Sequence, residues 1–203
     1  MDIKAFIFDM DGLLFDSERI VQRSWEIAGD ELGIPHMGDV IYHTLGMNRT
    51  GRNEYFRKYI REDFPFEEFG RLTRDNFWKI VDKEGLPLKK GAKELLAYGK
   101  SQGYKMAVAT SSSREYAMGN LIRAGIDSYF DSVVCGDMVK KAKPDPEIYI
   151  YTMKKMGVKP KDCYVVEDST FGLQAAERAG AIVICKKDDR FGYDQSGADY
   201  YID

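Results

Sequence analysis

The chain has 203 residues, which is long enough to bury one large hydrophobic core or two smaller ones. Its 44% hydrophobic and 31% charged residues are the proportions of an ordinary globular protein. Thirty basic against 33 acidic residues give a net charge of −3, which argues against a nucleic-acid-binding surface or a polybasic membrane patch. No apolar run reaches the length of a membrane span or of a signal peptide. The three cysteines form no CxxC pair, so we expect reduced thiols in a cytoplasmic protein.

Five short apolar runs are expected to form a parallel sheet. They are continuously hydrophobic, which is typical of strands that are buried on both faces. They span residues 5–8, 106–109, 133–135, 164–166 and 181–185, and residues 198–203 are a candidate for a short edge strand. Helix signals separate the later runs: predicted helices begin near Ala92, Ser113, Asp145 and Ser169, and each stops at a glycine. The repeated units predict an α/β fold with a doubly wound, Rossmann-like parallel sheet.

Roughly 90 residues separate the first two strands, far more than one crossover helix needs. Helical patterns occur at 17–32, 51–61 and 65–83. We therefore predict an α/β core domain of residues 1–15 and 87–203, interrupted by a helical domain of residues 16–86. The aromatic residues of this insertion are expected to form its core rather than a binding platform: Tyr55, Phe56, Tyr59, Phe64, Phe66, Phe69, Phe77 and Trp78.

Polar side chains follow several of the predicted strands. Asp9 and Asp11 come after the first strand in the sequence Asp-Met-Asp-Gly, which alone could be a simple turn. Thr110 and Ser111 begin a run of four hydroxyl residues after the second strand; they suit a phosphate at a helix start but could also be helix caps.

Two further clusters follow later in the chain. Lys143 precedes Pro144 in a segment that prolines restrict, although an exposed lysine is the ordinary interpretation. Glu167 and Asp168 follow the fourth strand, where an acidic helix cap is the simpler alternative.

Because ligands bind at the carboxyl ends of the strands in such sheets, we expect these clusters to form one site. Its four carboxylates would repel a phosphate dianion strongly. A hard divalent cation resolves this repulsion, and an oxygen-only ligand set favours Mg²⁺. Lys143 would neutralise the remaining charge. The residues alone therefore predict a magnesium-dependent phosphate site.

The four ordered motifs, Asp9-x-Asp11-Gly12, Thr110, Lys143-Pro144 and Glu167-Asp168, resemble those of the haloacid dehalogenase-like superfamily. The likeness covers nearly the whole chain, and it is to the branch with a helical cap inserted after the first strand. It implies the core strand order 5-4-1-2-3 and a phosphatase that acts on a small phosphorylated metabolite, such as a sugar phosphate. We expect a monomer.

The resemblance also implies roles for the residues. Asp9 would attack phosphorus and form an aspartyl-phosphate, and Asp11 would be the general acid and base. Mg²⁺ would be held by the Asp9 and Asp168 carboxylates and the Asp11 carbonyl, with Glu167 a ligand directly or through water. Thr110 and the Ser111 amide would bind the phosphoryl oxygens, and Lys143 would stabilise the transition state.

There are four alternatives to the phosphatase. Dehalogenases and phosphonate-cleaving enzymes of the superfamily lack the Asp-x-Asp pattern. β-Phosphoglucomutase shares all four motifs but has a histidine early in the first cap helix, where this chain has Val21; the only histidines are His36 and His43. Hydrolysis is therefore favoured over phosphosugar mutase activity. A non-catalytic phosphate-binding module would not need both Asp9 and Asp11.

The inserted domain is expected to determine the substrate. Arg49 follows a predicted loop at residues 44–48, and its planar guanidinium suits the oxygens of a sugar or a second phosphate, although an exposed surface arginine is an equal alternative. Two linkers, near residues 14–16 and 85–90, are expected to let the helical domain open for substrate and close to exclude water.

Overall fold

The computed structural model describes residues 3–44, 49–188 and 194–203, without the side chains of residues 49 and 50. The chain divides into two compact units. One contains Ser17–Gly85, and the other contains the chain up to Asp16 together with Leu86–Asp188 and Asp194–Asp203. Among the described residues, none of the helices is both long enough and apolar enough to cross a membrane.

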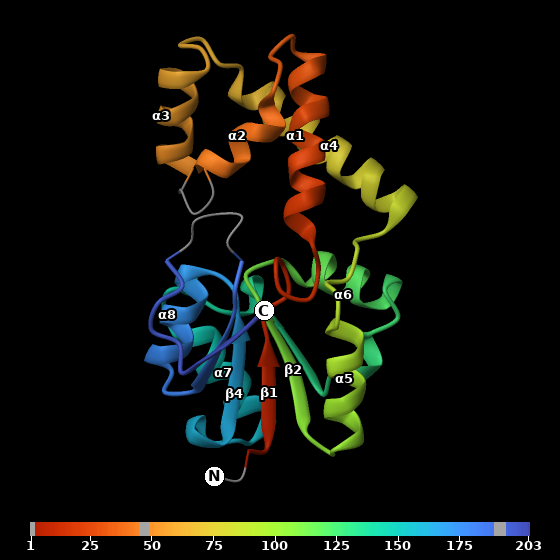
Figure 1. The fold of residues 1–203 in the computed structure, drawn as a ribbon, viewed down its shortest axis with the longest axis vertical. Coiled ribbons are helices and arrows are strands. Elements are labelled where there is room, and N and C mark those ends of the chain that lie inside the picture. Colours follow the sequence, from red (N-terminus) through yellow and green to blue (C-terminus); the bar gives the residue numbers. More distant parts are fainter. Residues whose placement is uncertain (1–2, 45–48, 189–193) are drawn as a thin grey trace. The chain divides into compact units, whose positions relative to one another are not determined.

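The sheet belongs to the second of these units and is parallel throughout (Figure 1). Its order is β3-β2-β1-β4-β5-β6, which confirms the predicted fold class and the predicted order of the first five strands. The strands are β1 (Ala5–Phe8), β2 (Lys105–Thr110), β3 (Ser132–Cys135), β4 (Cys163–Glu167), β5 (Ile182–Lys186) and β6 (Tyr200–Ile202). The candidate edge strand is therefore real, and all three of its side chains are exposed.

The helices of this unit cover the sheet and begin within two residues of their predicted starts, although the predicted Asp145 cap of the helix that begins at Glu147 is wrong, because the N-cap there is Pro146 and has no side-chain cap. They are α5 (Ala92–Ser101), α6 (Arg114–Arg123), α7 (Glu147–Met156) and α8 (Thr170–Arg178), with short 3₁₀ turns η1 (Asp127–Tyr129), η2 (Gly136–Met138) and η3 (Pro160–Asp162). Ser113 caps α6 and Ser169 caps α8 through side-chain hydrogen bonds to backbone N–H groups. Both caps therefore fix a helix start directly after a strand end, where the predicted site residues lie.

The other unit is helical and contains α1 (Ser17–Glu31), α2 (Met37–Thr44), α3 (Arg49–Tyr59) and α4 (Phe66–Glu84). The helix α2 was not predicted. Trp25 of α1 makes edge-on ring contacts with Phe56 and Phe69, at centroid distances of 5.6 Å. A second contact between α1 and α4 is the bidentate ion pair of Arg23 with Glu84.

The prediction that the aromatic residues of this unit form its core is right for most of them and wrong for two. Phe56, Phe64 and Phe69 are buried and lie in one hydrophobic cluster. Tyr59 and Trp78, by contrast, are 59% and 38% exposed. Tyr59 instead contacts the ring of Tyr55 and Trp78 that of Phe77, and neither residue belongs to the cluster.

The two chain segments that connect the units are hydrogen-bonded to each other. Phe15 and Leu88 form an antiparallel bridge. The Asp16 N–H donates to the Pro87 carbonyl, and the Lys89 N–H donates to the Leu14 carbonyl, both at 2.9 Å. These paired segments lie at the two ends of the helical unit Ser17–Gly85.

Candidate functional site

The carboxyl end of β1 lies between the carboxyl ends of β2 and β4. Phe8 is opposite Val108 of β2 and Val166 of β4, so Asp9 follows at the level where all three strands end. The Asp9 N–H still donates to the Val166 carbonyl at 3.0 Å, which holds the residue in line with the strand. The side chain of Asp9 therefore lies at the carboxyl end of the sheet, and the residue is only 8% exposed.

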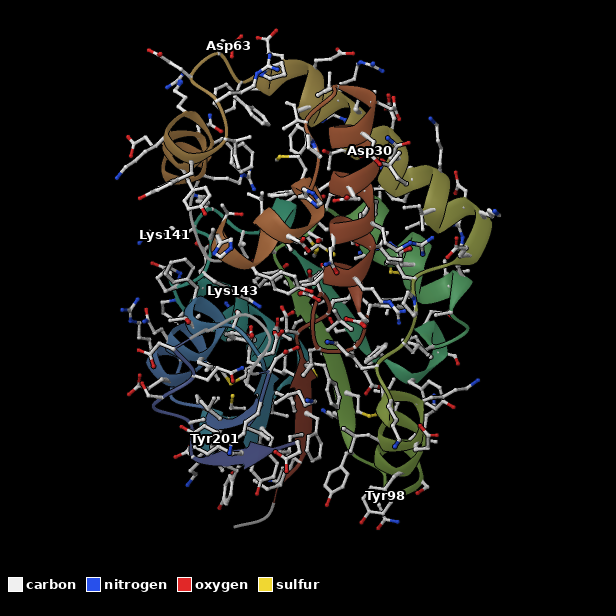
Figure 2. All side chains as sticks on the ribbon, turned by 45° about the horizontal axis from the view of Figure 1, so that its top comes forward. Asp30, Asp63, Tyr98, Lys141, Lys143 and Tyr201 are labelled. Carbon is white, nitrogen blue, oxygen red and sulfur yellow. The ribbon has the colours of Figure 1, made fainter. Side chains whose placement is uncertain are left out.

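Lys143, which is labelled in Figure 2, belongs to the segment before α7 and reaches Asp9. Its ammonium nitrogen donates to Asp9 Oδ1 at 2.5 Å, to Glu167 Oε1 at 2.7 Å and to the carbonyl of Ala109 at 3.1 Å. An ammonium group has three protons to donate, and here each has an acceptor. The lysine therefore joins the ends of β1, β2 and β4, and the alternative of an exposed surface lysine is wrong.

Glu167 is buried completely, and both of its oxygens are occupied by donors. Oε1 accepts from Lys143 and from the phenol hydroxyl of Tyr149 at 2.5 Å. Oε2 accepts from the backbone N–H groups of Asp168 and Ser169 and from the Ser169 hydroxyl, at 3.0–3.2 Å. A carboxylate has about four lone-pair positions. These five donors therefore fill the capacity of Glu167.

Gly172, in the first turn of α8, makes this arrangement possible. A Cβ atom built at Gly172 would overlap the carboxylate of Glu167. The Gly172 N–H donates to the Ser169 hydroxyl at 3.1 Å. The same hydroxyl therefore caps α8 and donates to the Glu167 carboxylate. The absence of a side chain at this position thus gives Glu167 its place beside Lys143.

Replacing Gly172 with alanine should destabilise the protein by about 1–3 kcal/mol, the usual cost of adding atoms to a well-packed interior. Gly119 of α6 provides the matched control, because a Cβ there would have no atom within 4 Å. Gly119→Ala should leave stability unchanged or raise it by up to about 1 kcal/mol through helix propensity. Thermal unfolding of both variants measures the difference, and equal melting temperatures would show that the overlap is relieved without cost.

The electrostatics of the cluster differ between its two carboxylates. Burial raises the pKa of Asp9 to about 8, because Lys143 offsets this effect only in part and Glu167 adds to it. Burial also opposes the ionisation of Glu167, but Lys143 and the hydrogen bonds from Tyr149 and Ser169 outweigh it and lower its pKa. Burial would lower the pKa of Lys143, yet Asp9 and Glu167 raise it well above its usual range. The Lys143 ammonium is thus the shared cation of two carboxylates. A second cation would stabilise Asp9 in its ionised form.

The cluster of buried acidic side chains at this position could hold such a cation. Asp9, Glu167 and Asp168 each offer one carboxylate oxygen, and these oxygens lie within 4.8 Å of one another. Hard oxygen donors suit Mg²⁺. Since Glu167 is already filled by hydrogen-bond donors, Asp9 and Asp168 are the better candidates for direct ligands. The residues present therefore fit a divalent cation.

Asp11 lies next to this cluster and has different partners. The Ser112 hydroxyl donates to Asp11 Oδ2 at 2.7 Å, and the Tyr116 hydroxyl donates to Asp11 Oδ1 at 3.0 Å. Gly12 follows with φ of +85°, a conformation that glycine adopts without strain. The tight turn after β1 thereby directs Asp11 toward the start of α6.

Thr110 and Ser111 lie at the end of β2, between Ala109 and the start of α6. Thr110 is 1% exposed, and its hydroxyl accepts the Ser112 N–H at 3.0 Å. Ser111 is exposed. Neither residue caps α6, because Ser113 does so, and the simple helix-cap alternative for this pair is wrong.

Several residues around the site were not singled out from the sequence. Tyr149 and Tyr116 lie within helices, where a tyrosine gives no local sign of a polar contact. Gln195 donates to the Asp168 carbonyl at 2.6 Å from a loop 27 residues away. Ser112 and Ser169 belong to hydroxyl-containing motifs that the sequence did mark. Arg49 begins α3, but its side chain lies outside the described part of the chain.

The chain is similar in sequence to known proteins. A sequence model described as haloacid dehalogenase-like hydrolase matches residues 3–180. A phosphorylated carbohydrates phosphatase of Thermotoga maritima is 33% identical over 178 residues, which cover 88% of this chain and 82% of that protein.

Two solved structures resemble the whole chain. A Thermotoga maritima protein provisionally named β-phosphoglucomutase is 28% identical, with a TM-score of 0.82 over 98% of this chain and 94% of that one. The protein CbbY from Rhodobacter sphaeroides, solved in complex with phosphate, is 26% identical, with a TM-score of 0.74 over 98% and 93% of the two chains.

Proposed function

Because the chain belongs to the haloacid dehalogenase-like hydrolases, we propose that it is a magnesium-dependent phosphatase of a small phosphorylated carbohydrate. One observation carries the proposal: Asp9 is held at the carboxyl end of β1 by Lys143, within an oxygen-rich group that suits a divalent cation. The substrate class is that of the Thermotoga phosphatase.

In the first half of the proposed reaction, a carboxylate oxygen of Asp9 forms a bond to phosphorus. The bond between phosphorus and the ester oxygen breaks, and its electron pair goes to the leaving oxygen, which takes a proton from Asp11. In the second half, a water molecule gives a proton back to Asp11 and attacks the aspartyl-phosphate. The acyl oxygen leaves phosphorus, so Asp9 is a carboxylate again and inorganic phosphate is released.

The other residues bind and orient the phosphoryl group. Lys143 stabilises the negative charge on Asp9 and on the phosphoryl oxygens, and Glu167 keeps the lysine in place. Thr110 and the Ser111 amide bind the phosphoryl oxygens from the end of β2.

Mg²⁺ would be held by the Asp9 and Asp168 carboxylates and the Asp11 carbonyl, with Glu167 acting through its hydrogen bonds rather than as a direct ligand. When bound, the ion neutralises charge on the phosphoryl oxygens during transfer. The pKa of Asp9, raised to about 8, supports this assignment because the nucleophile needs a second positive charge to be fully ionised.

The helical unit is proposed as a cap that determines which alcohol part of the ester is accepted, with Arg49 as a substrate contact. Its two linkers would act as a hinge that opens for substrate and closes to exclude water.

The proposal is tested by metal removal. The protein should release inorganic phosphate from p-nitrophenyl phosphate with Mg²⁺ present, and dialysis against EDTA should lower turnover at least about 100-fold. Added Mg²⁺ should restore it, whereas Ca²⁺ should not, because its longer and more variable bonds place the phosphoryl group differently. Full turnover in EDTA would exclude the metal, and no turnover with Mg²⁺ would favour a phosphate-binding module. A panel of phosphorylated carbohydrates then identifies the substrate.

A phosphosugar mutase is the second candidate, because the chain resembles the provisionally named β-phosphoglucomutase over nearly its whole length. The two activities differ in product, since a mutase returns the phosphoryl group to another hydroxyl of the same sugar. Val21 of α1 stands where the mutase was expected to have a histidine, which favours release of free phosphate. Measuring inorganic phosphate and isomerised sugar phosphate from β-glucose 1-phosphate separates the two.

A further inference from the structure

The geometry around Asp11 points to a role for Tyr116 of α6. We propose that Tyr116 is a positioning residue: its phenol hydroxyl, together with the hydroxyl of Ser112, holds the Asp11 carboxyl in the orientation from which it protonates the leaving oxygen. The inference rests on the proposed function, because it takes Asp11 as the general acid.

The two hydrogen bonds restrain Asp11 from two different elements. Ser112 belongs to the loop after β2 and donates to Oδ2 at 2.7 Å, whereas Tyr116 belongs to α6 and donates to Oδ1 at 3.0 Å. One hydrogen bond would leave a carboxyl free to rotate about its terminal bond, whose torsion is broad. Two bonds, one to each oxygen, fix both the position and the plane of the group.

Tyr116 can impose this restraint because its own backbone is fixed. Its N–H donates to the Ser113 side chain at 3.4 Å, and its carbonyl accepts from Asn120 Nδ2 at 2.9 Å. Asn120 is 3% exposed. The first turn of α6 is thus held at both ends, and the phenol ring extends from it to Asp11.

The chemical type of the partners matches the task of Asp11. A hydroxyl donates to a carboxylate and also accepts from a carboxylic acid, so the same two partners can hold Asp11 before and after it gives up its proton. An ammonium group only donates, and it therefore favours the ionised form alone. Asp9, which must remain a carboxylate to attack phosphorus, has the ammonium of Lys143. The two aspartates thus have partners of different kinds.

The test compares two esters of similar size with different leaving groups. Nitrophenolate leaves without a proton, whereas the benzyl alkoxide needs one, so only benzyl phosphate depends on a well-placed acid. The value of kcat/KM covers the steps up to departure of the alcohol and excludes hydrolysis of the aspartyl-phosphate. For Tyr116→Phe, we expect kcat/KM to fall about 10-fold with benzyl phosphate, part of the 10²–10⁴-fold that general acid catalysis contributes. With p-nitrophenyl phosphate the fall should be less than about twofold.

Two further variants keep the test decisive. Ser112→Ala removes the other hydroxyl and should give the same preferential loss with benzyl phosphate. Tyr98→Phe removes an exposed phenol hydroxyl on α5, well away from Lys143 in Figure 2, and should change neither value. Equal losses with both esters, no loss, or a gain in the Tyr116 variant would overturn the inference, because each would deny a role in placing the acid. Wild-type protein that cleaves neither ester would instead overturn the proposed function, and the inference with it.

Discussion

Replacing Asp9 with asparagine should reduce turnover of p-nitrophenyl phosphate by about 10⁴-fold or more, the scale of losing a nucleophile. The amide has nearly the shape of the carboxylate, but it cannot attack phosphorus or neutralise Lys143 in the same way. Lys143 keeps its bonds to Glu167 and to the Ala109 carbonyl, so the variant should remain folded. Thermal unfolding therefore separates lost chemistry from lost structure.

A trapping experiment on the wild type checks the same prediction by a direct route. Acid quenching during turnover should retain a phosphorylated protein, and borohydride should reduce its acyl phosphate to homoserine at position 9. Asp30→Asn, at an exposed position of α1, is the control and should turn over normally. Near-normal turnover in the Asp9 variant, or homoserine at a different position, would exclude Asp9 as the nucleophile.

Replacing Lys143 with methionine should damage both stability and activity. The side chain of Lys143 is 7% exposed and bonds two buried carboxylates, so its loss leaves Asp9 and Glu167 without their shared cation. Breaking a buried ion pair in this way costs about 3–5 kcal/mol. Turnover should fall about 10³-fold, because a charge-stabilising donor at the phosphoryl group is lost as well.

Lys141 provides the matched control two residues earlier (Figure 2). Its ion pair with Asp145 is 3.3 Å long, but its side chain is 70% exposed, and such surface pairs contribute little. Lys141→Met should therefore leave the melting temperature and turnover nearly unchanged. If the two methionine variants behaved alike, the cluster around Lys143 would not have the role assigned to it.

The parts of the fold that could be predicted from the sequence are those with local causes. Continuous apolar runs marked the strands of the parallel sheet, and Ser113 and Ser169 marked the starts of α6 and α8 because a cap acts within three residues. The helix α2 was missed because tertiary contacts stabilise it. Met37 and Ile41 are buried in the cluster of the helical unit, and Glu26 of α1 accepts the Gly38 N–H at 2.7 Å.

In the candidate site, too, some features follow from local sequence and others depend on tertiary contacts. Asp9 and Glu167 could be predicted to lie together because parallel strands bring their carboxyl ends to one edge of the sheet. The bond from Tyr149 to Glu167 spans 18 residues, and the bond from Tyr116 to Asp11 spans 105. Neither contact has a sequence pattern, because each depends on how a helix packs against the sheet. The sequence thus indicates the proposed reacting groups better than the residues that hydrogen-bond to them.

The hydrogen-bonded linkers have a consequence for how this protein could be altered. Because Phe15 and Leu88 are direct neighbours, the two ends of the inserted segment lie within reach of an ordinary hairpin turn. A short turn could therefore replace the insertion, or a foreign helical segment could be transplanted between the same two points, without stretching the sheet. The inserted segment thus leaves and re-enters the α/β unit through a pair of hydrogen-bonded segments that follow the turn after β1.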